Sequence, residues 1–122
     1  MSGLLRLKDD AAFQRVYREG RSWTTSLLIL RASPNGLPHS RIGYTTSKRL
    51  GSAVSRNRVK RRMREAFRAH AVRLAPGWDL VLIAREPSRQ AAFAQLERAV
   101  AQLLVHVRLP QPAGPAGKAR LG

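Results

Sequence analysis

SAVSRNRVKRRMREAFRAHAVR, at residues 52–73, contains neither proline nor glycine, and its periodicity predicts the longest helix of the chain. At 100° per residue, a set of apolar side chains together with one histidine falls within about a third of the helix circumference. These residues are Val59, Met63, Ala66, Phe67 and His70. Pro76-Gly77 stops the pattern. One face of this helix is therefore expected to pack against a hydrophobic core.

A second face of the same helix is polar and positively charged. Its central residues follow the spacing i, i+4, i+7 and i+11, and three more cations flank them: Asn57, Arg61, Arg64 and Arg68, with Arg58, Arg62 and Lys60. Residues 48–68 hold nine of the 23 cations of the chain and one acid, Glu65. Solvated helix faces usually mix charge signs, because like charges at i and i+4 cost about a few tenths of a kcal/mol. The pattern favours a nucleic-acid-binding face over a merely solvated one.

Shorter segments on both sides of this helix predict a small sheet. Residues 27–30 are an apolar run that ends in a Pro/Asn/Gly-rich turn at 33–38. Residues 41–46 then form a second strand, which is expected to pair with the first as a hairpin. Residues 78–85 are the best strand of the chain, and their nearly unbroken apolar character predicts a central strand covered on both faces.

Two further helices complete the expected fold. Residues 11–20 follow a capping Asp at 9 or 10, end at Gly20 and place Phe13, Val16 and Tyr17 on one face. A last helix opens at Pro87 and Ser88, with Ser88 as its cap, and carries one apolar stripe formed by Phe93, Leu96, Val100, Leu103, Leu104 and Val107. The order is helix, two strands or more, helix, strand, helix, which predicts an α+β fold (an α/β sandwich) with helices over one small sheet. We expect one domain over residues 1–109 and a disordered Pro/Gly-rich tail over residues 110–122.

The composition points to a polyanionic partner. Lys and Arg number 23 against 7 Asp and Glu, which gives a net charge of +16, and 19 of these cations are Arg. So large an excess repels itself in a free domain and is tolerated where a polyanion neutralises it. The chain has no Cys, and therefore no disulfide frame or thiolate metal site. Its start lacks the apolar run of a signal peptide and no segment is apolar enough to span a membrane, so a soluble cytoplasmic protein is expected.

Other uses of a basic helix fit the sequence less well. A helix on a membrane surface needs a broad apolar face of Trp, Phe and Leu, whereas this apolar face is narrow and suits a core. A basic leucine-zipper region is disfavoured because no leucine heptads follow Phe67. A general RNA-binding protein, such as a ribosomal component or an RNA chaperone, shares the charge and the small core and stays open as the alternative.

The motif at the start of the basic helix resembles the signature of the bacterial ribonuclease P protein. RNRVKR at residues 56–61 is preceded by SKRLG at 47–51 and followed by REAF at 64–67. RLK at 6–8, the aromatic pair in the first helix and the segment 79–87 agree with the same family, so the resemblance covers roughly residues 4–108. It implies a central mixed sheet packed by helices, in the order α-β-β-(β)-α-β-α, with a left-handed crossover that joins two parallel strands through the basic helix.

The resemblance also implies a function and its residues. The family's protein binds a catalytic RNA, one protein to one RNA, and helps it to remove the 5′ leader of precursor tRNA. By position, the residues implied to bind the RNA subunit are Lys48, Arg49, Arg56, Asn57, Arg58, Lys60, Arg61, Arg64 and Arg68. The residues implied to bind the leader are Arg6, Lys8, Phe13, Tyr17 and Arg31. Two positions depart from the family pattern, since Arg31 stands where many relatives have an aromatic residue and Asp9 where a cation is common.

The protein is not expected to perform the hydrolysis with its own side chains. Protein-catalysed cleavage of a phosphodiester needs carboxylates placed around metal ions, or an acid–base set such as His and Lys. The seven acids are scattered, and His39, His70 and His106 make no metal-ligand spacing with each other or with an acid. The sequence therefore predicts no catalytic residue and no protein-bound metal, with Mg²⁺ acting together with the RNA subunit.

Overall fold

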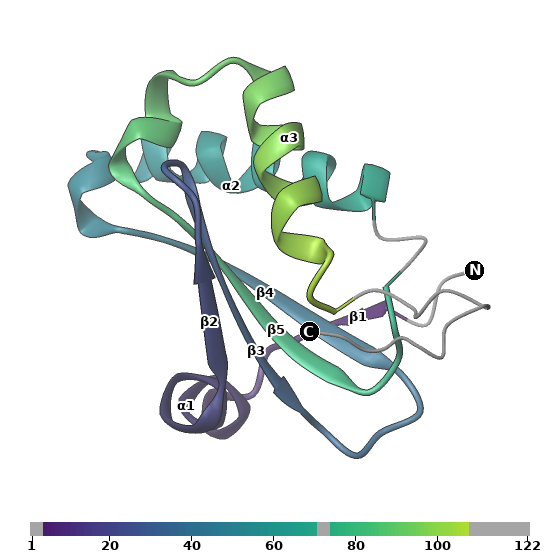
Figure 1. Ribbon diagram of the computed structural model, residues 1–122. Helices are drawn as coiled ribbons and strands as arrows, with labels where there is room; N and C mark the ends of the chain where they lie inside the picture. The colour runs from purple at the N-terminus through teal and green to yellow at the C-terminus, as the bar shows by residue number, and fades with distance from the viewer. Residues whose placement is uncertain (1–3, 71–73, 108–122) are drawn as a thin grey trace.

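The computed structural model describes residues 4–70 and 74–107, which form one mixed sheet with helices on both faces (Figure 1). The strands in chain order are β1 (Leu4–Arg6), β2 (Arg21–Thr24), β3 (Leu28–Pro34), β4 (Ser40–Thr46) and β5 (Trp78–Ala84). The helices are α1 (Asp10–Glu19), α2 (Ala53–His70) and α3 (Phe93–Leu104), with short 3-10 helices η1 (Lys48–Leu50) and η3 (Glu86–Gln90). The architecture is the α+β fold that the sequence predicted.

The main core lies between the sheet and the pair α2 and α3, above the sheet in Figure 1. Alternate residues of β3 and β5, such as Leu30 and Leu82, point into it from below. From above come most of the predicted apolar side chains of the two helices, and these are buried: Val59, Met63, Ala66 and Phe67 of α2, and Leu96, Val100, Leu103 and Leu104 of α3. Periodicity alone therefore identified the core faces of both helices correctly.

Among the described elements, α1 is the one helix on the opposite face of the sheet, and it is seen below the sheet in Figure 1. A smaller apolar cluster of Leu7, Ala12, Val16 and Val81 holds α1 there. The helix begins where expected, because the Asp9 carboxylate accepts a hydrogen bond from the backbone N–H of Ala11 at 3.0 Å.

Gly20 follows the last residue of α1 for a reason that the sequence did not reveal. Its φ is −77°, so it does not use the left-handed backbone conformation that glycine usually supplies after a helix. Instead, a Cβ there would collide with the carbonyl oxygen of Val16 and approach that of Ala32 to 2.9 Å. The residue must be glycine because the chain passes close to two backbones.

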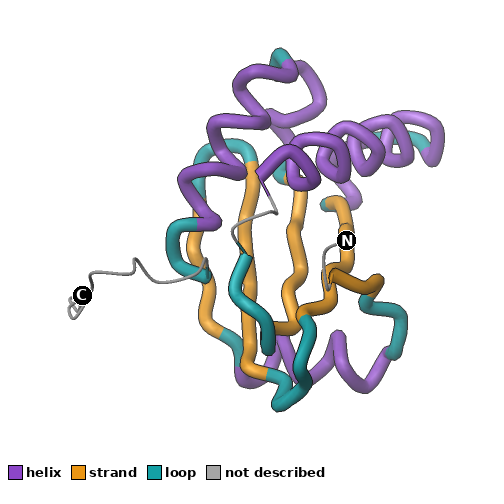
Figure 2. The backbone as a smooth tube through the Cα atoms, turned by 90° about the vertical axis from the view of Figure 1, so that its right-hand side faces the viewer, coloured by secondary structure: helices purple, strands orange, loops and turns teal. Residues whose placement is uncertain are grey.

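The strand pairing corrects one prediction. The spatial order is β1-β4-β5-β3-β2, so β3 and β4 do not form a hairpin although they are consecutive in the chain. β5 lies between them, antiparallel to β3 and parallel to β4. Leu80 and Leu82 of β5 face the main core and Val81 faces α1, so the strand can be buried on both faces and occupies the centre, as predicted. The crossover through α2 joins the parallel pair β4 and β5 (Figure 2).

The last helix also begins later than predicted. Residues 86–90 form η3, and the Ser88 hydroxyl donates to the Arg85 carbonyl instead of capping a helix. α3 then begins at Phe93, where the Gln95 side chain accepts from the backbone N–H of Ala92 at 2.8 Å. Phe93 lies in the first turn and is exposed, so it does not belong to the buried stripe. Predictions for Arg73 and for the tail from residue 110 lie outside the described residues.

Candidate nucleic-acid interface

The polar face of α2 is a continuous cationic surface. Six of the nine residues that the sequence assigned to the RNA subunit are exposed, namely Lys48, Arg49, Asn57, Arg58, Arg61 and Arg68. The other three, Arg56, Lys60 and Arg64, are partly buried along the same helix. Because the apolar face of α2 is fixed in the main core, the helix backbone presents these groups along its other face.

These cations are not neutralised by acids of the protein. Within residues 4–70 and 74–107 the ion pairs are Arg18 with Glu19, at 3.5 Å, and Arg41 with Asp79, at 2.7 Å, and neither includes a residue of α2. Glu65 is the one acid of the helix and lies exposed on its surface. The guanidinium groups thus keep their charge available for an external polyanion.

Some cations near α2 also brace the backbone. Arg56 donates from Nη1 to the carbonyl of Gly51 at 3.1 Å, which links the helix to the turn that precedes it. Arg62, which flanks the predicted polar stripe, donates from Nη2 to the carbonyl of Ala91 at 2.6 Å. This bond ties α2 to the segment before α3, so the structure gives Arg62 a packing role.

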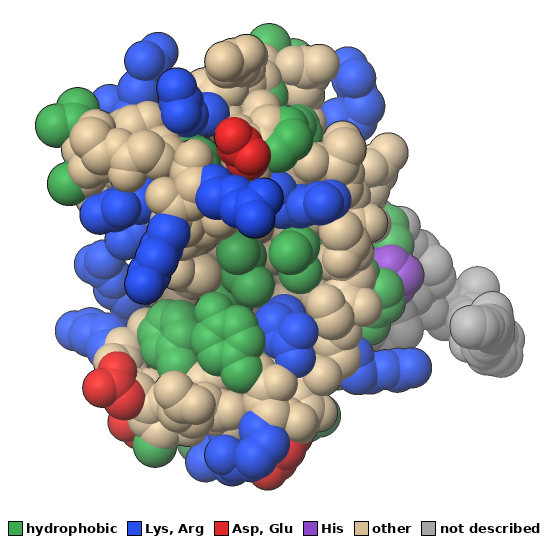
Figure 3. All heavy atoms as spheres, turned by 90° about the vertical axis from the view of Figure 1, so that its left-hand side faces the viewer, with side chains coloured by type: hydrophobic (Ala, Val, Ile, Leu, Met, Phe, Trp, Pro, Cys, Tyr) green, Lys and Arg blue, Asp and Glu red, His purple; other side chains and the backbone are tan. Residues whose placement is uncertain are grey.

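A second candidate surface lies on the α1 side of the sheet. Phe13 packs over Gly43 of β4, and Tyr17 lies one helical turn further along α1 with its side chain exposed. Arg31 of β3 joins them, since its guanidinium carbon is 5.4 Å from the Tyr17 ring centroid and Nη2 donates to the Tyr17 carbonyl at 2.7 Å. Figure 3 shows an apolar patch on this side of the molecule with Lys and Arg around it.

The environment of Tyr17 keeps its hydroxyl protonated. Partial burial raises the pKa of Tyr17, and the nearby positive charge of Arg31 opposes this rise without cancelling it. Arg31 Nε is itself buried and finds no hydrogen-bond partner among the described residues. An aromatic ring beside a planar guanidinium is a surface on which a nucleic-acid base can stack.

The same side of the sheet contains an open hollow of about 450 Å³ that the sequence did not reveal. Ile29 and Ile83 are partly buried in its wall, and Arg49 and Arg85 line it from η1 and the end of β5. Arg85 is held there by a hydrogen bond from Nη1 to the carbonyl of Thr25 at 2.7 Å. A possible signal was the alternation along β3, in which Ile29 falls on the face opposite Leu28 and Leu30.

The structure does not bring all five predicted leader residues together. Lys8 is exposed in the segment between β1 and α1. Arg6 pairs in register with Ile42, whose side chain belongs to the main core, so Arg6 lies on the α2 side of the sheet. Phe13, Tyr17 and Arg31 lie on the opposite side.

Tyr44 of β4 is a residue that sequence reasoning missed. Its ring meets Phe67 of α2 edge to face at 6.1 Å, and the guanidinium carbon of Arg64 lies 5.6 Å from its centroid. Burial raises the pKa of Tyr44 to about 12, although the positive charges of Arg64, Arg68 and Arg6 each lower it. The sequence treated Tyr44 only as part of a strand, because nothing in the strand pattern shows which helix residue will cover it.

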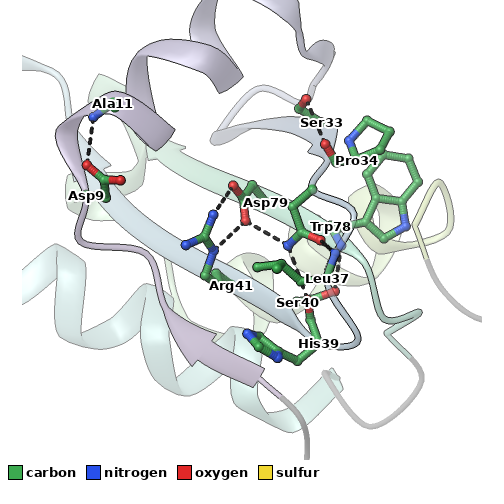
Figure 4. Close-up of polar contacts among 11 residues, drawn as sticks. Asp9, Ala11, Ser33, Pro34, Leu37, His39, Ser40, Arg41, Trp78 and Asp79 are labelled. Atoms are coloured by element: carbon green, nitrogen blue, oxygen red, sulfur yellow. Dashed lines mark hydrogen bonds and ion pairs between the residues drawn. The ribbon is translucent and has the colours of Figure 1, made fainter.

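A buried polar cluster fixes the far end of the central strands (Figure 4). Arg41 of β4 donates two hydrogen bonds to the Asp79 carboxylate of β5, at 2.8 and 2.7 Å. Asn35 donates a third to the same carboxylate at 2.9 Å. Burial alone would raise the pKa of Asp79, but these hydrogen bonds outweigh it and hold the pKa below its usual value. Both carboxylate oxygens of Asp79 accept hydrogen bonds from neighbouring side chains, so the cluster has a structural role in joining β4 to β5.

The described residues contain neither a cluster of metal ligands nor a helix that could span a membrane. Across residues 4–70 and 74–107, no three His, Asp or Glu side chains gather closely enough to hold an ion. None of the described helices is both long enough and apolar enough to cross a membrane.

His106 stacks on Trp23 with ring centroids 4.6 Å apart, which docks the end of α3 on β2.

The chain is similar to known proteins over nearly its whole length. A family model described as Ribonuclease P matches residues 1–108. The ribonuclease P protein component of Roseiflexus sp. (strain RS-1) is 44% identical over 123 residues, covering 100% of both chains. That of Clostridioides difficile (strain 630) is 36% identical, covering 80% of this chain and 87% of the relative.

Solved structures agree with the fold as well. The RNase P protein of Staphylococcus aureus superposes with a TM-score of 0.72 at 32% identity, covering 83% of this chain and 92% of that one. The RNase P protein of Thermotoga maritima gives a TM-score of 0.76 at 27% identity, covering 84% and 97%.

Proposed function

This chain belongs to the ribonuclease P protein family, and we propose which of its surfaces binds the RNA subunit and which binds the substrate. It is the protein component of an endoribonuclease that processes the 5′ ends of tRNA, and its partner in the ribonucleoprotein is RNA. The observation that carries the proposal is the cationic face of α2, whose charges have no partner acid among the described residues. Such a face can bind the phosphates of an RNA backbone.

The α2 face binds the RNA subunit. Its contacts come from Lys48 and Arg49 of η1 and from the exposed and half-buried polar residues of α2: Arg56, Asn57, Arg58, Lys60, Arg61, Arg64 and Arg68. Each phosphate that such a cation neutralises releases counterions. The logarithm of the binding constant therefore falls by about 0.7–0.9 per contact for each tenfold rise in salt concentration. Arg is the better choice for this task because its planar fork matches phosphate oxygens.

The α1 side of the sheet binds the single-stranded 5′ leader of precursor tRNA. Phe13, Tyr17 and Arg31 supply stacking surfaces, and Lys8 supplies charge at the entry to α1. Stacking of a base on an aromatic side chain contributes about 1–3 kcal/mol and tolerates any base, which suits a leader of variable sequence. Arg31 provides a planar guanidinium in place of a ring.

Hydrolysis of the phosphodiester is carried out by the RNA subunit with Mg²⁺. The protein contributes charge: cations between two RNAs reduce their mutual repulsion and so lower the Mg²⁺ concentration that assembly and substrate binding require. One protein of a single domain, residues 1–109, acts with one RNA in the cytoplasm.

The decisive test is cleavage of a precursor tRNA by the cognate RNA subunit at low Mg²⁺, with and without the protein. We expect strong stimulation by the protein and no cleavage by the protein alone. Salt-sensitive RNA binding without stimulation would instead identify a general RNA-binding protein, such as a ribosomal component or an RNA chaperone.

A further inference from the structure

Tyr44 of β4 lies where α2 and the edge strand β1 come together, beyond the residues of the α2 face. Its ring packs against Phe67, which is fully buried, and Arg64 lies over the ring at 5.6 Å. Because Phe67 fixes the tyrosine and the tyrosine ring attracts the guanidinium, Arg64 is held in a restricted position beside the sheet. Arg61 differs because it is exposed and makes no cation–π contact with any described aromatic ring.

Arg6 reaches the same junction from the edge strand β1. β1 runs parallel to β4 with Arg6 opposite Ile42, and Tyr44 is two residues further along β4 on the same face. The positive charge of Arg6 acts on the Tyr44 hydroxyl, as do those of Arg64 and Arg68. Figure 2 shows α2 extending toward the side of the sheet on which the chain begins.

Three guanidinium groups therefore lie on the same side of the sheet near one tyrosine: Arg64 is over its ring, Arg68 is one helical turn further along α2, and Arg6 is on the neighbouring strand. Arg6 and Arg68 are exposed and Arg64 is half-buried, and neither ion pair in residues 4–70 and 74–107 includes any of them. Like charges at close range repel, and a phosphate with several anionic oxygens is the ligand that removes this repulsion while accepting from several forks at once.

We propose that Arg6, Arg64 and Arg68 form a phosphate-binding site for the RNA subunit, and that Tyr44 is a positioning residue that holds Arg64 in it. The inference rests on the proposed function and extends the α2 face across β4 to β1. It assigns Arg6 to the RNA subunit, whereas the family resemblance implied a role at the leader. We favour the RNA subunit because Arg6 lies on the α2 side of the sheet, whereas the leader residues lie on the α1 side. These leader residues are Phe13, Tyr17 and Arg31.

The first experiment compares Arg6→Gln with Arg98→Gln, which removes the same charge from an exposed position on α3. The affinity of the full-length protein for the RNA subunit is measured by filter binding over a range of salt. We expect Arg6→Gln to weaken binding about fivefold and to reduce the salt slope by about 0.7–0.9, the value of one phosphate contact. The Arg98→Gln protein should retain the wild-type slope.

A parallel measurement separates the RNA subunit from the leader. The assembled holoenzyme is titrated with precursor tRNAs that carry either a long leader or a leader of one nucleotide. Arg6→Gln should leave the ratio of the two affinities unchanged. If it lowers that ratio and binds the RNA subunit as tightly as Arg98→Gln does, Arg6 serves the leader and the proposal is wrong.

The role of Tyr44 is tested by a measurement that distinguishes positioning of Arg64 from a general loss of packing. Tyr44→Phe keeps the ring and should keep both the affinity and the salt slope, whereas Tyr44→Leu should weaken RNA-subunit binding about threefold and reduce the slope. In an Arg64→Gln background, Tyr44→Leu should have no further effect on affinity, because the group it positions is gone. An equal loss in both backgrounds would refute positioning.

Failure of this inference differs from failure of the proposed function. Arg61→Ala lies outside the Tyr44 site and reports on the α2 face as a whole. If Arg61→Ala weakens RNA binding and Arg6→Gln does not, the α2 face is right and the extension to β1 is wrong. If neither variant changes the affinity, both proposals are wrong.

Discussion

The two faces of the sheet differ in how completely helices cover them. On one face α2 and α3 enclose β3, β4 and β5, and the core residues there, such as Leu30 and Phe67, have no exposed surface. On the other face α1 is the one described helix and covers a small cluster, and Ile29, Ile83 and Arg31 stay partly exposed beside it. The first face therefore provides most of the stability, whereas the second is less completely buried and leaves a surface open for binding. A change on each face should therefore affect different measurements.

The largest expected effect is the loss of stability from Phe67→Ala. Phe67 is fully buried between α2 and the sheet and meets Tyr44 edge to face. Removing a buried aromatic ring costs about 3–5 kcal/mol through lost contacts and the cavity left behind. Urea unfolding followed by circular dichroism measures this loss. Phe13→Ala on the half-covered face is the matched control, and we expect it to cost about half as much; equal losses would show that α1 covers its face as tightly as α2 and α3 cover theirs.

Asp79→Asn should cost somewhat less, about 3 kcal/mol, because it leaves the Arg41 guanidinium without its carboxylate in a mostly buried site. The effect should depend on pH. The pKa of Asp79 is lower in the folded protein than in the unfolded chain, so its ionised form adds stability that is complete above about pH 4 and is lost as the pH falls through the folded pKa.

Urea unfolding of the wild type and of Asp79→Asn at pH 7 and pH 3 checks both statements about this pair. The difference in unfolding free energy between the two proteins should shrink at the lower pH. A constant difference would mean that packing of the side chain, rather than its charge, stabilises the strand ends.

Arg61→Ala should leave stability almost unchanged and weaken binding of the RNA subunit by about 1 kcal/mol, or roughly fivefold, with a smaller salt slope. Arg61 is exposed on the polar face of α2 and touches none of the core, so the fold does not depend on it. Filter binding at several salt concentrations measures the change. Unchanged affinity at moderate salt would contradict the assignment of the α2 face.

The sequence predicted helices better than strands, for a physical reason. α2 spans 18 residues, so its core face and its charged face each repeat over several turns and can be recognised from spacing alone. β1 has three residues and no repeat to detect, and β2 has four, with little burial. Pairing is harder still, because β3 and β4 are adjacent in the chain, yet the doubly buried β5 separates them.

The same limit explains which site residues were placed well. The cations of α2 followed from helical geometry. The family resemblance alone implied that Tyr17 and Arg31 belong to one surface, and it did not predict their direct contact. The face on which Arg6 lies depends on its register with Ile42, and a shift of one residue would reverse it. That register is set by tertiary pairing, so no pattern within three residues could have revealed it.

The smallest expected effect is also the most specific to the half-covered face. Gly43 of β4 lies directly under Phe13, and a methyl group added at this position would overlap the Phe13 ring. Gly43→Ala therefore has to push the ring outward without adding or removing charge. Stability should fall by about 1 kcal/mol, and affinity for a precursor tRNA with a long leader should fall about threefold, because the stacking surface is displaced but not removed. Binding of the RNA subunit should not change, since α2 lies on the other side of the sheet. Phe13→Ala gives the full loss as a reference, and if Gly43→Ala weakened binding of long-leader and mature tRNA equally, the ring beneath α1 would be a core residue rather than part of a leader site.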